Sequence, residues 1–401
     1  MLAKSSTELV RLQNSILVLK AVRRKGQLSH TEIADITHLS SATVSAITAD
    51  LERAHILQKS EAQAAARRGR PRVLFTQRRD IAYLIVIIIS SDAMQYSLAD
   101  YSGRLIDRFV EPRVEGGAGA FLQAIRDGLG RIAERSQISA EQVRAISISS
   151  KGIVEPNEPV LMWSPVLGSE RVDFAEGLSD RWPSRILLSN ETLLVARALG
   201  RRAAQEKGRA FKGLASLSLG HSIGLGLALR RSVDGLEVTA PNFGHMLHVP
   251  NVALCRCGAH GCIEAYAGFY AILRSAFEVP RDTIPAKFVP LAEVDKLAAS
   301  ARNGERRPGY AFREAGLALG YGLSRVLSLN GGMPITVTGP GARYFDLLRA
   351  GLVEGLSQSQ VVRMEGLPEI SVAADEPQLV FEGHLERALD LIDEDIVLTV
   401  P

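Results

Sequence analysis

The chain contains Gly244-His245 and, after nine intervening residues, Cys255-Arg-Cys-Gly-Ala-His-Gly-Cys-Ile-Glu264. This segment holds all three cysteines of the 401 residues. Three cysteines so close together cannot build a disulfide framework, but they suit a metal. With one imidazole they form the Cys₃His set that surrounds zinc tetrahedrally and leaves no open position. We therefore predict a structural Zn²⁺ bound by His245, Cys255, Cys257 and Cys262, with His248 and His260 as competing imidazole donors. Reduced thiols without a metal are the alternative.

The composition around this segment is that of a folded protein. Hydrophobic residues make up 46% of the chain and charged residues 23%, which excludes disordered and collagen-like classes. The longest apolar stretch, around Ile81–Ile89, is too short to span a bilayer. Charges at Lys4, Glu8 and Arg11 break any signal-peptide pattern. We therefore expect a cytoplasmic protein without a membrane segment.

The charge is distributed unevenly along the chain. Residues 1–80 contain 14 Lys and Arg against 7 Asp and Glu, whereas the remaining 321 residues contain 33 against 37. A basic head on a mildly acidic body indicates that the head binds a polyanion, although a solvated basic face is the alternative.

The head has the pattern of a helix-turn-helix. A helix over Leu12–Arg24 is followed by the capping box Ser29-His-Thr-Glu32, which starts a short helix. After a turn at His38–Ser40, a second helix over about Ser41–His55 has Val44, Ile47 and Leu51 on one face. In this arrangement the second helix enters the major groove of DNA, and small or hydroxyl side chains allow a close approach. The residues expected to contact DNA here are Ser41, Ala42, Thr43, Ser45 and Ala46.

A basic loop follows the two helices. The arginines of Arg67-Arg-Gly-Arg-Pro-Arg72 lie between two potential strands, which fits a wing that contacts the DNA backbone or a minor groove. We therefore expect DNA contacts from Arg67, Arg68, Arg70 and Arg72. The alternatives are a basic interdomain linker and, for the head as a whole, a helical protein-interaction module.

Beyond residue 80 the pattern changes to apolar strands separated by amphipathic helices. A first series includes strands at Ala82–Ile89 and Ala145–Ser149 and ends in a helix over about Glu191–Arg202. A second series starts at Leu214–Leu219 and includes Ile335–Val337. Two such series predict two similar α/β lobes with a cleft between them. We place the domains at 1–80, 81–200 and 201–379, with the option that residues 380–401 pack back on the first lobe.

The motif Gly-His followed by Cys-x-Cys-Gly-x-x-Gly-Cys-x-Glu resembles the signature of the ROK family (repressors, open reading frames and sugar kinases). The head resembles that of its transcriptional-regulator branch, which includes xylose and N-acetylglucosamine repressors. The resemblance implies an α/β fold, with an N-terminal winged helix-turn-helix followed by a two-lobed, actin-like and ribonuclease-H-like ROK body with a zinc loop.

The phosphate motifs depart from the family pattern. The family's first motif, Asp-x-Gly-Gly-Thr, aligns with Ile88, Ser90, Ser91 and Asp92, so the acidic residue and the glycines are absent. The second motif survives in part in Gly220-His-Ser-Ile-Gly-Leu-Gly226, and the adenosine-side Gly-Gly pair is interrupted in Gly339-Pro-Gly341. Because glycines allow phosphates to approach the backbone, these changes predict that the chain does not use ATP.

The sugar-binding positions change less. The family's Asn-Asp pair, with its catalytic Asp, corresponds to Asn190-Glu191, and its Glu-x-Gly-His corresponds to Asn242-Phe-Gly-His245. The resemblance therefore implies an effector pocket of Asn190, Glu191, Asn242, His245 and Glu264, with Glu191 at the position of the catalytic base. The bland alternative is that these are ordinary loop residues without a ligand.

The sequence therefore predicts a non-enzymatic transcriptional regulator, expected to be a repressor, that binds an operator in double-stranded DNA. A sugar or sugar-derivative effector in the interlobe cleft controls it, and the expected assembly is a homodimer or a dimer of dimers. A regulator without a small-molecule ligand and an ATP-dependent sugar kinase are the alternatives.

Overall fold

The computed structural model describes residues 6–61, 73–90, 92–155, 157–164, 167–231, 235–286 and 288–400. The chain forms two compact units. Unit 1 consists of Met1–Asn190 together with His384–Pro401, and unit 2 consists of Glu191–Gly383. Among the described helices, none combines the length and the apolar character that crossing a membrane requires.

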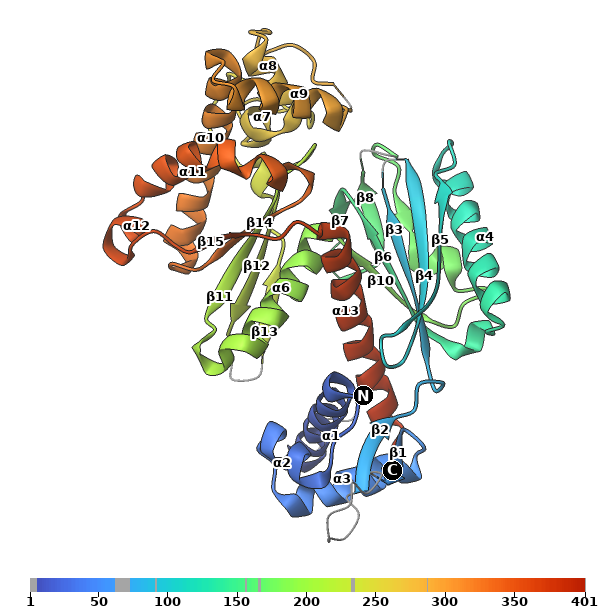
Figure 1. Cartoon of the computed structure of the whole chain (residues 1–401). Helices are drawn as coiled ribbons and strands as arrows, with labels where there is room; N and C mark the ends of the chain where they lie inside the picture. The colour runs from blue at the N-terminus through green and yellow to red at the C-terminus, as the bar shows by residue number, and fades with distance from the viewer. Residues whose placement is uncertain are drawn as a thin grey trace. The chain divides into compact units, whose positions relative to one another are not determined.

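Unit 1 begins with three helices and a two-stranded hairpin (Figure 1). These are α1 (Ser6–Lys25), α2 (His30–Thr37), α3 (Ser41–Arg53), β1 (Leu57–Glu61) and β2 (Val73–Gln77). The capping box predicted at Ser29 and Glu32 starts α2. Buried apolar side chains from every element form the core of this head: Leu19, Val22, Ile33, Val44, Ile47, Leu51, Leu57 and Phe75. The predicted winged helix-turn-helix is confirmed.

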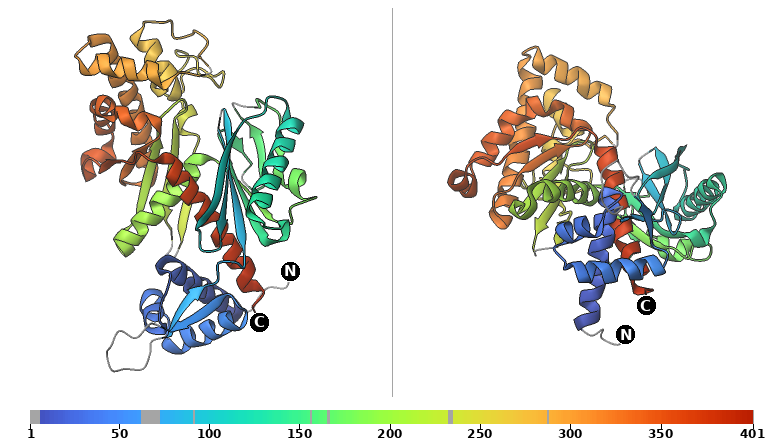
Figure 2. Two further views of the ribbon diagram at one scale, coloured as in Figure 1. Left: turned by 45° about the vertical axis from the view of Figure 1, so that its right-hand side comes forward. Right: turned by 60° about the horizontal axis from the view of Figure 1, so that its bottom comes forward.

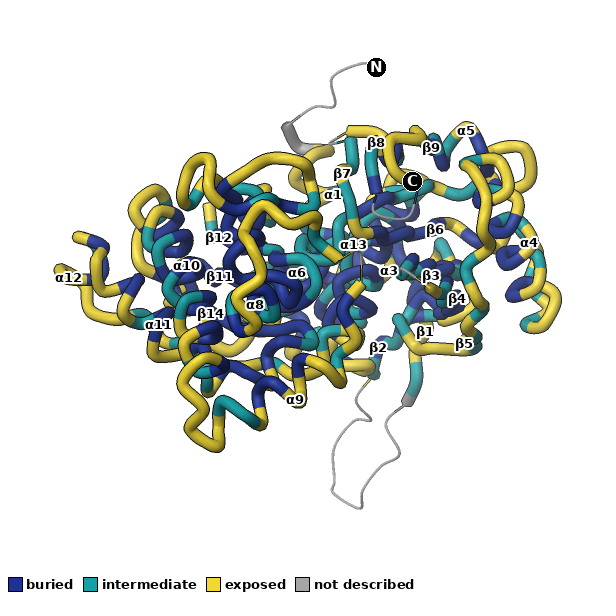
Figure 3. Tube along the Cα trace, turned by 90° about the horizontal axis from the view of Figure 1, so that it is seen from above, coloured by how far each residue is buried: buried dark blue, intermediate teal, exposed yellow. Residues whose placement is uncertain are grey.

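The larger part of unit 1 is a five-stranded sheet with the order β10-β6-β3-β4-β5. Its strands are β3 (Tyr83–Ile89), β4 (Ala93–Asp100), β5 (Leu105–Pro112), β6 (Val143–Ser150) and β10 (Arg185–Ser189). β3, β4 and β5 are antiparallel neighbours, whereas β6 and β10 add in parallel. The central strands β3 and β6 are buried (Figure 3). Helix α4 (Ala118–Ser136) covers one face of this sheet (Figures 1 and 2).

Smaller elements complete unit 1. The strands β7 (Ile153–Val154), β8 (Val160–Trp163) and β9 (Val172–Asp173) form a three-stranded sheet, followed by α5 (Phe174–Leu178).

Unit 2 repeats the arrangement with a sheet of order β13-β12-β11-β14-β15. Its strands are β11 (Gly213–Ser218), β12 (Gly224–Arg230), β13 (Leu236–Thr239), β14 (Ile335–Thr338) and β15 (Ile370–Val372). Again three antiparallel strands are followed by two parallel ones. The helices of this unit are α6 (Glu191–Lys207), α7 (Glu264–Ala267), α8 (Phe269–Ala276), α9 (Leu291–Arg302), α10 (Arg306–Asn330), α11 (Phe345–Ser357) and α12 (Gln360–Glu365). The two predicted α/β lobes are therefore present.

Helix α6 differs from its predicted assignment. The sequence placed residues up to 200 in the first lobe, but α6 packs on β11, β12 and β13 and belongs to unit 2. Glycines in β12 make the close packing possible, because a Cβ at Gly226 would lie 2.4 Å from the carbonyl oxygen of Thr192.

The last helix, α13 (Glu376–Leu398), is a single helix whose residues from His384 onward belong to unit 1. In unit 1 its Asp393 is fully buried and accepts hydrogen bonds from Arg23 of α1 and from the hydroxyl of Tyr101, the latter at 2.6 Å. A second ion pair joins Lys20 and Asp390 at 2.8 Å. The head is therefore anchored to the end of the chain.

Candidate functional site

Helix α3 presents a face of small side chains. Ser40 caps the helix by accepting a hydrogen bond from the Thr43 amide at 3.1 Å. Val44, Ile47 and Leu51 are buried, and the Thr48 hydroxyl contacts His30 of α2 at 2.8 Å, which fixes α3 against α2. The opposite face is exposed and carries Ser41, Ala42, Ser45, Ala46 and Ala49.

Of the five predicted contact residues on α3, Thr43 differs from the rest. It is half-buried, and its hydroxyl lies 2.8 Å from the Ser40 hydroxyl, so its first role is to support the cap. The other four side chains are exposed and small, so α3 could approach the major groove of DNA closely.

The hairpin after α3 has the register of a wing. β1 pairs with β2 from Leu57 opposite Gln77 to Glu61 opposite Val73. The predicted wing arginines Arg67, Arg68, Arg70 and Arg72 lie outside the described residues.

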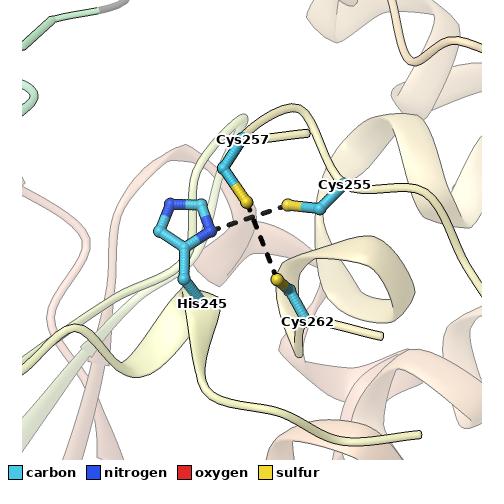
Figure 4. A group of neighbouring side chains, drawn as sticks. All are labelled: His245, Cys255, Cys257 and Cys262. Carbon is cyan, nitrogen blue, oxygen red and sulfur yellow. Dashed lines mark hydrogen bonds between the residues drawn. The ribbon is translucent and has the colours of Figure 1, made fainter. Parts of the chain in front are cut away.

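The four residues predicted to bind zinc form a group that could hold a metal ion. The side chains of His245, Cys255, Cys257 and Cys262 point toward one another (Figure 4), and their ligand atoms all lie within 4.8 Å of one another. Cys255 Sγ is 3.6 Å from His245 Nδ1, and Cys257 Sγ is 3.7 Å from Cys262 Sγ. The competing donors His248 and His260 are not part of this cluster.

Two of the separations, the 3.6 Å and 3.7 Å ones, fit a tetrahedral metal shell. Zinc–sulfur bonds of about 2.3 Å and zinc–nitrogen bonds of about 2.0 Å imply ligand separations of roughly 3.6–3.8 Å. Burial raises the pKa of the Cys262 thiol, and neighbouring Cys255 and Cys257 add to the effect. A divalent cation would stabilise the thiolates in this place. Gly261, at φ 89°, forms the turn before Cys262, where a Cβ would lie 2.2 Å from the Val249 carbonyl oxygen.

Arg256 contacts the candidate site and was not among the residues predicted from the sequence. It stands between two metal ligands, and its guanidinium contacts Glu264 Oε1 at 3.1 Å, the Ser222 hydroxyl at 3.1 Å and the His221 carbonyl oxygen. Glu264 is 2% exposed and also accepts a hydrogen bond from the Ile223 amide at 3.2 Å. Arg256 therefore connects the metal loop, residues 255–262, to the Gly-rich segment, residues 220–226. An arginine between two metal-binding cysteines was the available signal.

The predicted effector residues are divided between the units. Asn190 is in unit 1, where its side-chain amide donates to the Gly152 carbonyl oxygen at 3.2 Å, whereas Glu191 starts α6 in unit 2. Asn242 is exposed, and Glu264 is held by Arg256. Their joint role in one pocket stays a prediction.

The segment that aligns with the family's first phosphate motif connects β3 to β4. The Ser90 hydroxyl donates to the Ala93 carbonyl oxygen at 2.9 Å and to Asp92 at 3.3 Å. Ile88 lies within β3, Asp92 is exposed, and Ser91 is outside the described residues. The second phosphate motif, residues 220–226, serves packing in part, because its Gly224 and Gly226 are residues of β12 that α6 packs against.

Comparisons with known families and proteins agree with this architecture. The ROK family model matches residues 109–307, and a winged helix-turn-helix DNA-binding model matches residues 11–58. The xylose repressor of Caldicellulosiruptor bescii is 22% identical over 87% of this chain and 88% of its own length. The DNA-binding transcriptional repressor Mlc of Escherichia coli is 21% identical over 94% of this chain and 92% of its own.

Solved structures show the same fold. A ROK family transcriptional regulator, described as a homologue of E. coli Mlc, superposes with a TM-score of 0.75 over 98% of this chain and 99% of its own, at 18% identity. The ROK hexokinase of Thermus thermophilus gives 0.57 over 77% of this chain and 97% of its own, also at 18%. Regulators and sugar kinases thus share this body. The chain contains a ROK family domain that follows an N-terminal winged helix-turn-helix domain.

Proposed function

We propose that this protein is a transcriptional repressor that binds operator DNA through α3 and the wing and responds to a sugar or sugar derivative. The observation that carries the proposal is the exposed face of small residues on α3, held in position by a complete winged helix-turn-helix core. The names of the similar proteins, two of them repressors over more than four fifths of their length, support the same function.

The DNA contacts follow from the chemistry of each element. Ala42, Ser45 and Ala46 approach base edges in the major groove, and Ser41 with the cap supports phosphate contacts. The arginines at 67, 68, 70 and 72 supply sequence-independent affinity through phosphates. The protein acts in the cytoplasm. It assembles as a homodimer or a dimer of dimers, because a two-fold assembly matches the symmetry of an inverted repeat in DNA.

The effector is a sugar bound by Asn190, Glu191, Asn242, His245 and Glu264. One contact favours a second candidate function, a regulator without a small ligand. Arg256 already occupies a carboxylate oxygen of Glu264, so this carboxylate has less capacity left for a hydroxyl ligand. Isothermal titration with a sugar panel separates the two candidates, because a complete absence of heat favours the ligand-free regulator.

Phosphoryl transfer is lost in this proposal, and the protein is not an enzyme. The Ser90–Asp92 turn supports the loss, because it presents a carboxylate where nucleotide phosphates would bind and offers no glycine backbone. Zn²⁺ at His245, Cys255, Cys257 and Cys262 is structural, since four protein ligands leave no position for substrate. A coupled ATPase assay that found sugar-dependent turnover abolished by Glu191→Ala would restore the kinase alternative.

The experiment for DNA binding is fluorescence anisotropy with the DNA upstream of the protein's own gene. Ala46→Glu introduces a negative charge on the exposed face of α3, and Gln13→Glu introduces the same charge on an exposed position of α1. We expect Ala46→Glu to weaken binding by about 100-fold or more and Gln13→Glu by less than about threefold. Equal effects of the two substitutions would contradict the assignment of α3.

A further inference from the structure

A cavity of about 860 Å³ in unit 2 has a strongly basic lining. It lies between α8 with the loop that follows and the first turns of α10. Its lining contains two glutamates, Glu278 and Glu314, and five arginines: Arg274, Arg281, Arg306, Arg307 and Arg313. Neither a metal ligand nor a predicted effector residue lines it.

The acidic side chains compensate only part of this charge. Glu314 contacts Arg281 at 2.7 Å, and Glu278 contacts Arg307 at 3.1 Å. Arg313 pairs with Glu354 at 2.5 Å, and Glu354 is not a residue of the cavity lining. Within the described part of the chain, no carboxylate lies within ion-pairing distance of Arg274 or Arg306. Neither arginine therefore has a counter-ion among the described residues of this site, although Arg274 is buried and Arg306 is exposed to water.

The side chain of Arg274 is buried and held in place by hydrogen bonds at this cavity. It is 7% exposed, and it donates hydrogen bonds to three backbone carbonyl oxygens, those of Leu254 at 3.2 Å, Ala265 at 2.8 Å and Arg281 at 2.8 Å. Burial lowers the pKa of its guanidinium. Carbonyl dipoles position a cation but bring no negative charge, so a bound anion would provide the missing compensation.

The first turn of α10 adds to the positive potential. This helix of 25 residues begins with Arg306 and Arg307, and its N-cap residue Glu305 makes no side-chain capping bond. Arginines at a helix N-terminus oppose the helix dipole and destabilise the turn, whereas an anion there stabilises it. The same anion would thus satisfy the helix end and the uncompensated arginines.

We propose that this cavity binds a phosphate-bearing small molecule, with Arg274 and Arg306 as the anion contacts. Guanidinium groups bind phosphate oxygens in pairs, which favours phosphate over a single carboxylate. The volume lies in the range of small-molecule sites, and the exposed ring of Tyr310 in the lining provides a flat surface for the remainder of the ligand.

The test is isothermal titration of the full-length, zinc-loaded protein at constant ionic strength with inorganic phosphate, a hexose 6-phosphate and the unphosphorylated hexose. Arg306→Gln removes one unpaired charge, and Arg349→Gln removes an exposed charge on α11 as the matched control. We expect saturable binding of the phosphorylated probes, at least about fivefold weaker in Arg306→Gln and unchanged in Arg349→Gln.

Several results would overturn the proposal. These are no saturable binding of either phosphorylated probe below about 10 mM, equal affinities in the two variants, or a hexose signal that Arg306→Gln abolishes. Arg274→Lys is the second variant, because it keeps the charge and loses the planar fork, and it should weaken phosphate binding if it folds. Binding of an acidic protein without any phosphate binding would assign the surface to a macromolecule and would likewise contradict the proposal.

Discussion

Arg256 illustrates what single residues contribute to this molecule. The sequence motif directs attention to the cysteines on either side of it, yet its guanidinium joins the metal loop, the Gly-rich segment and Glu264. A buried carboxylate is stable as an anion only when a charge or several donors compensate it. Arg256 thereby limits how much of Glu264 remains for any ligand, and its place between two cysteines was a signal for the residue but not for this contact.

The metal ligands yield the first prediction at this scale. Cys257→Ser removes one thiolate at an exposed position, and His260→Ala removes a neighbouring exposed imidazole outside the cluster. Because three remaining ligands bind zinc more weakly, the serine variant should lose most of its zinc and melt at a lower temperature. Elemental analysis and thermal unfolding measure both effects.

The alanine variant should retain about one zinc per chain, as in the unchanged protein. Equal zinc content in the two variants would contradict the assigned shell.

His384 gives a pH-dependent prediction. Its side chain is fully buried, its Nδ1 lies 2.7 Å from the Ser147 hydroxyl, and burial, with a smaller effect of Arg387, lowers the pKa of the imidazole to about 3. The unfolded chain binds the proton near pH 6.5, so this contribution to stability is complete above that pH and is lost progressively down to about pH 3.

Between pH 7.5 and pH 5 the contribution of His384 to the free energy of unfolding should fall by about 2 kcal/mol. Urea unfolding at both pH values compares the protein with His384→Asn, which keeps a polar group but does not titrate. Parallel pH dependence in the two proteins would show that His384 is not a buried neutral imidazole in the folded protein.

At the scale of elements, α1 and α13 make the contact that anchors the head. Arg23 and Tyr101 both donate to the fully buried Asp393, and the neighbouring pair of Lys20 and Asp390 is partly exposed. Asp393 raises the pKa of Arg23 despite the opposing effect of burial, which is larger than any other single contribution. Removing one partner of a buried ion pair leaves the other charge uncompensated.

Two substitutions on α13 form a matched test of this contact. Asp393→Asn should lower the free energy of unfolding by about 3 kcal/mol, and Asp390→Asn by less than about 1 kcal/mol, because water screens the second pair. Urea unfolding measures both values. A loss of similar size in the two variants would mean that the burial of Asp393 does not determine the anchoring.

The elements also show how far sequence reasoning reaches. Local signals were sufficient for the head, where the capping box at Ser29 and the periodicity of Val44, Ile47 and Leu51 predicted α2 and α3. The four residues that could hold a metal were predicted as a group because they lie within a short segment. The assignment of α6 to the first lobe was wrong, since packing on β12 depends on glycines 30 or so positions later.

The contacts of α13 lay beyond prediction for the same physical reason. Arg23 and Asp393 are 370 residues apart, and nothing local to either residue distinguishes it from a solvated charge. The basic cavity is similar, because its arginines come from α8, the following loop and α10.

At the scale of the whole molecule, a body shared with sugar kinases is combined with a DNA-binding head. The fold alone therefore does not distinguish a regulator from a kinase, and the residues at the individual sites must do so. The turn at Ser90 and Asp92 lacks the glycines of a phosphate loop, whereas α3 retains the small exposed face of a recognition helix. The molecule as a whole supports regulation of transcription more strongly than catalysis.

The proposed function requires that the intact chain recognises a specific DNA sequence through α3. Selection of bound DNA from a random library, with full-length zinc-loaded protein and with Ala46→Glu in parallel, tests it most directly. We expect the unchanged protein to enrich an inverted repeat with half-site centres about one helical turn, or a multiple of it, apart, and the variant to enrich none. Failure of the unchanged protein to enrich any sequence, or enrichment of the same sequence by the variant, would contradict it.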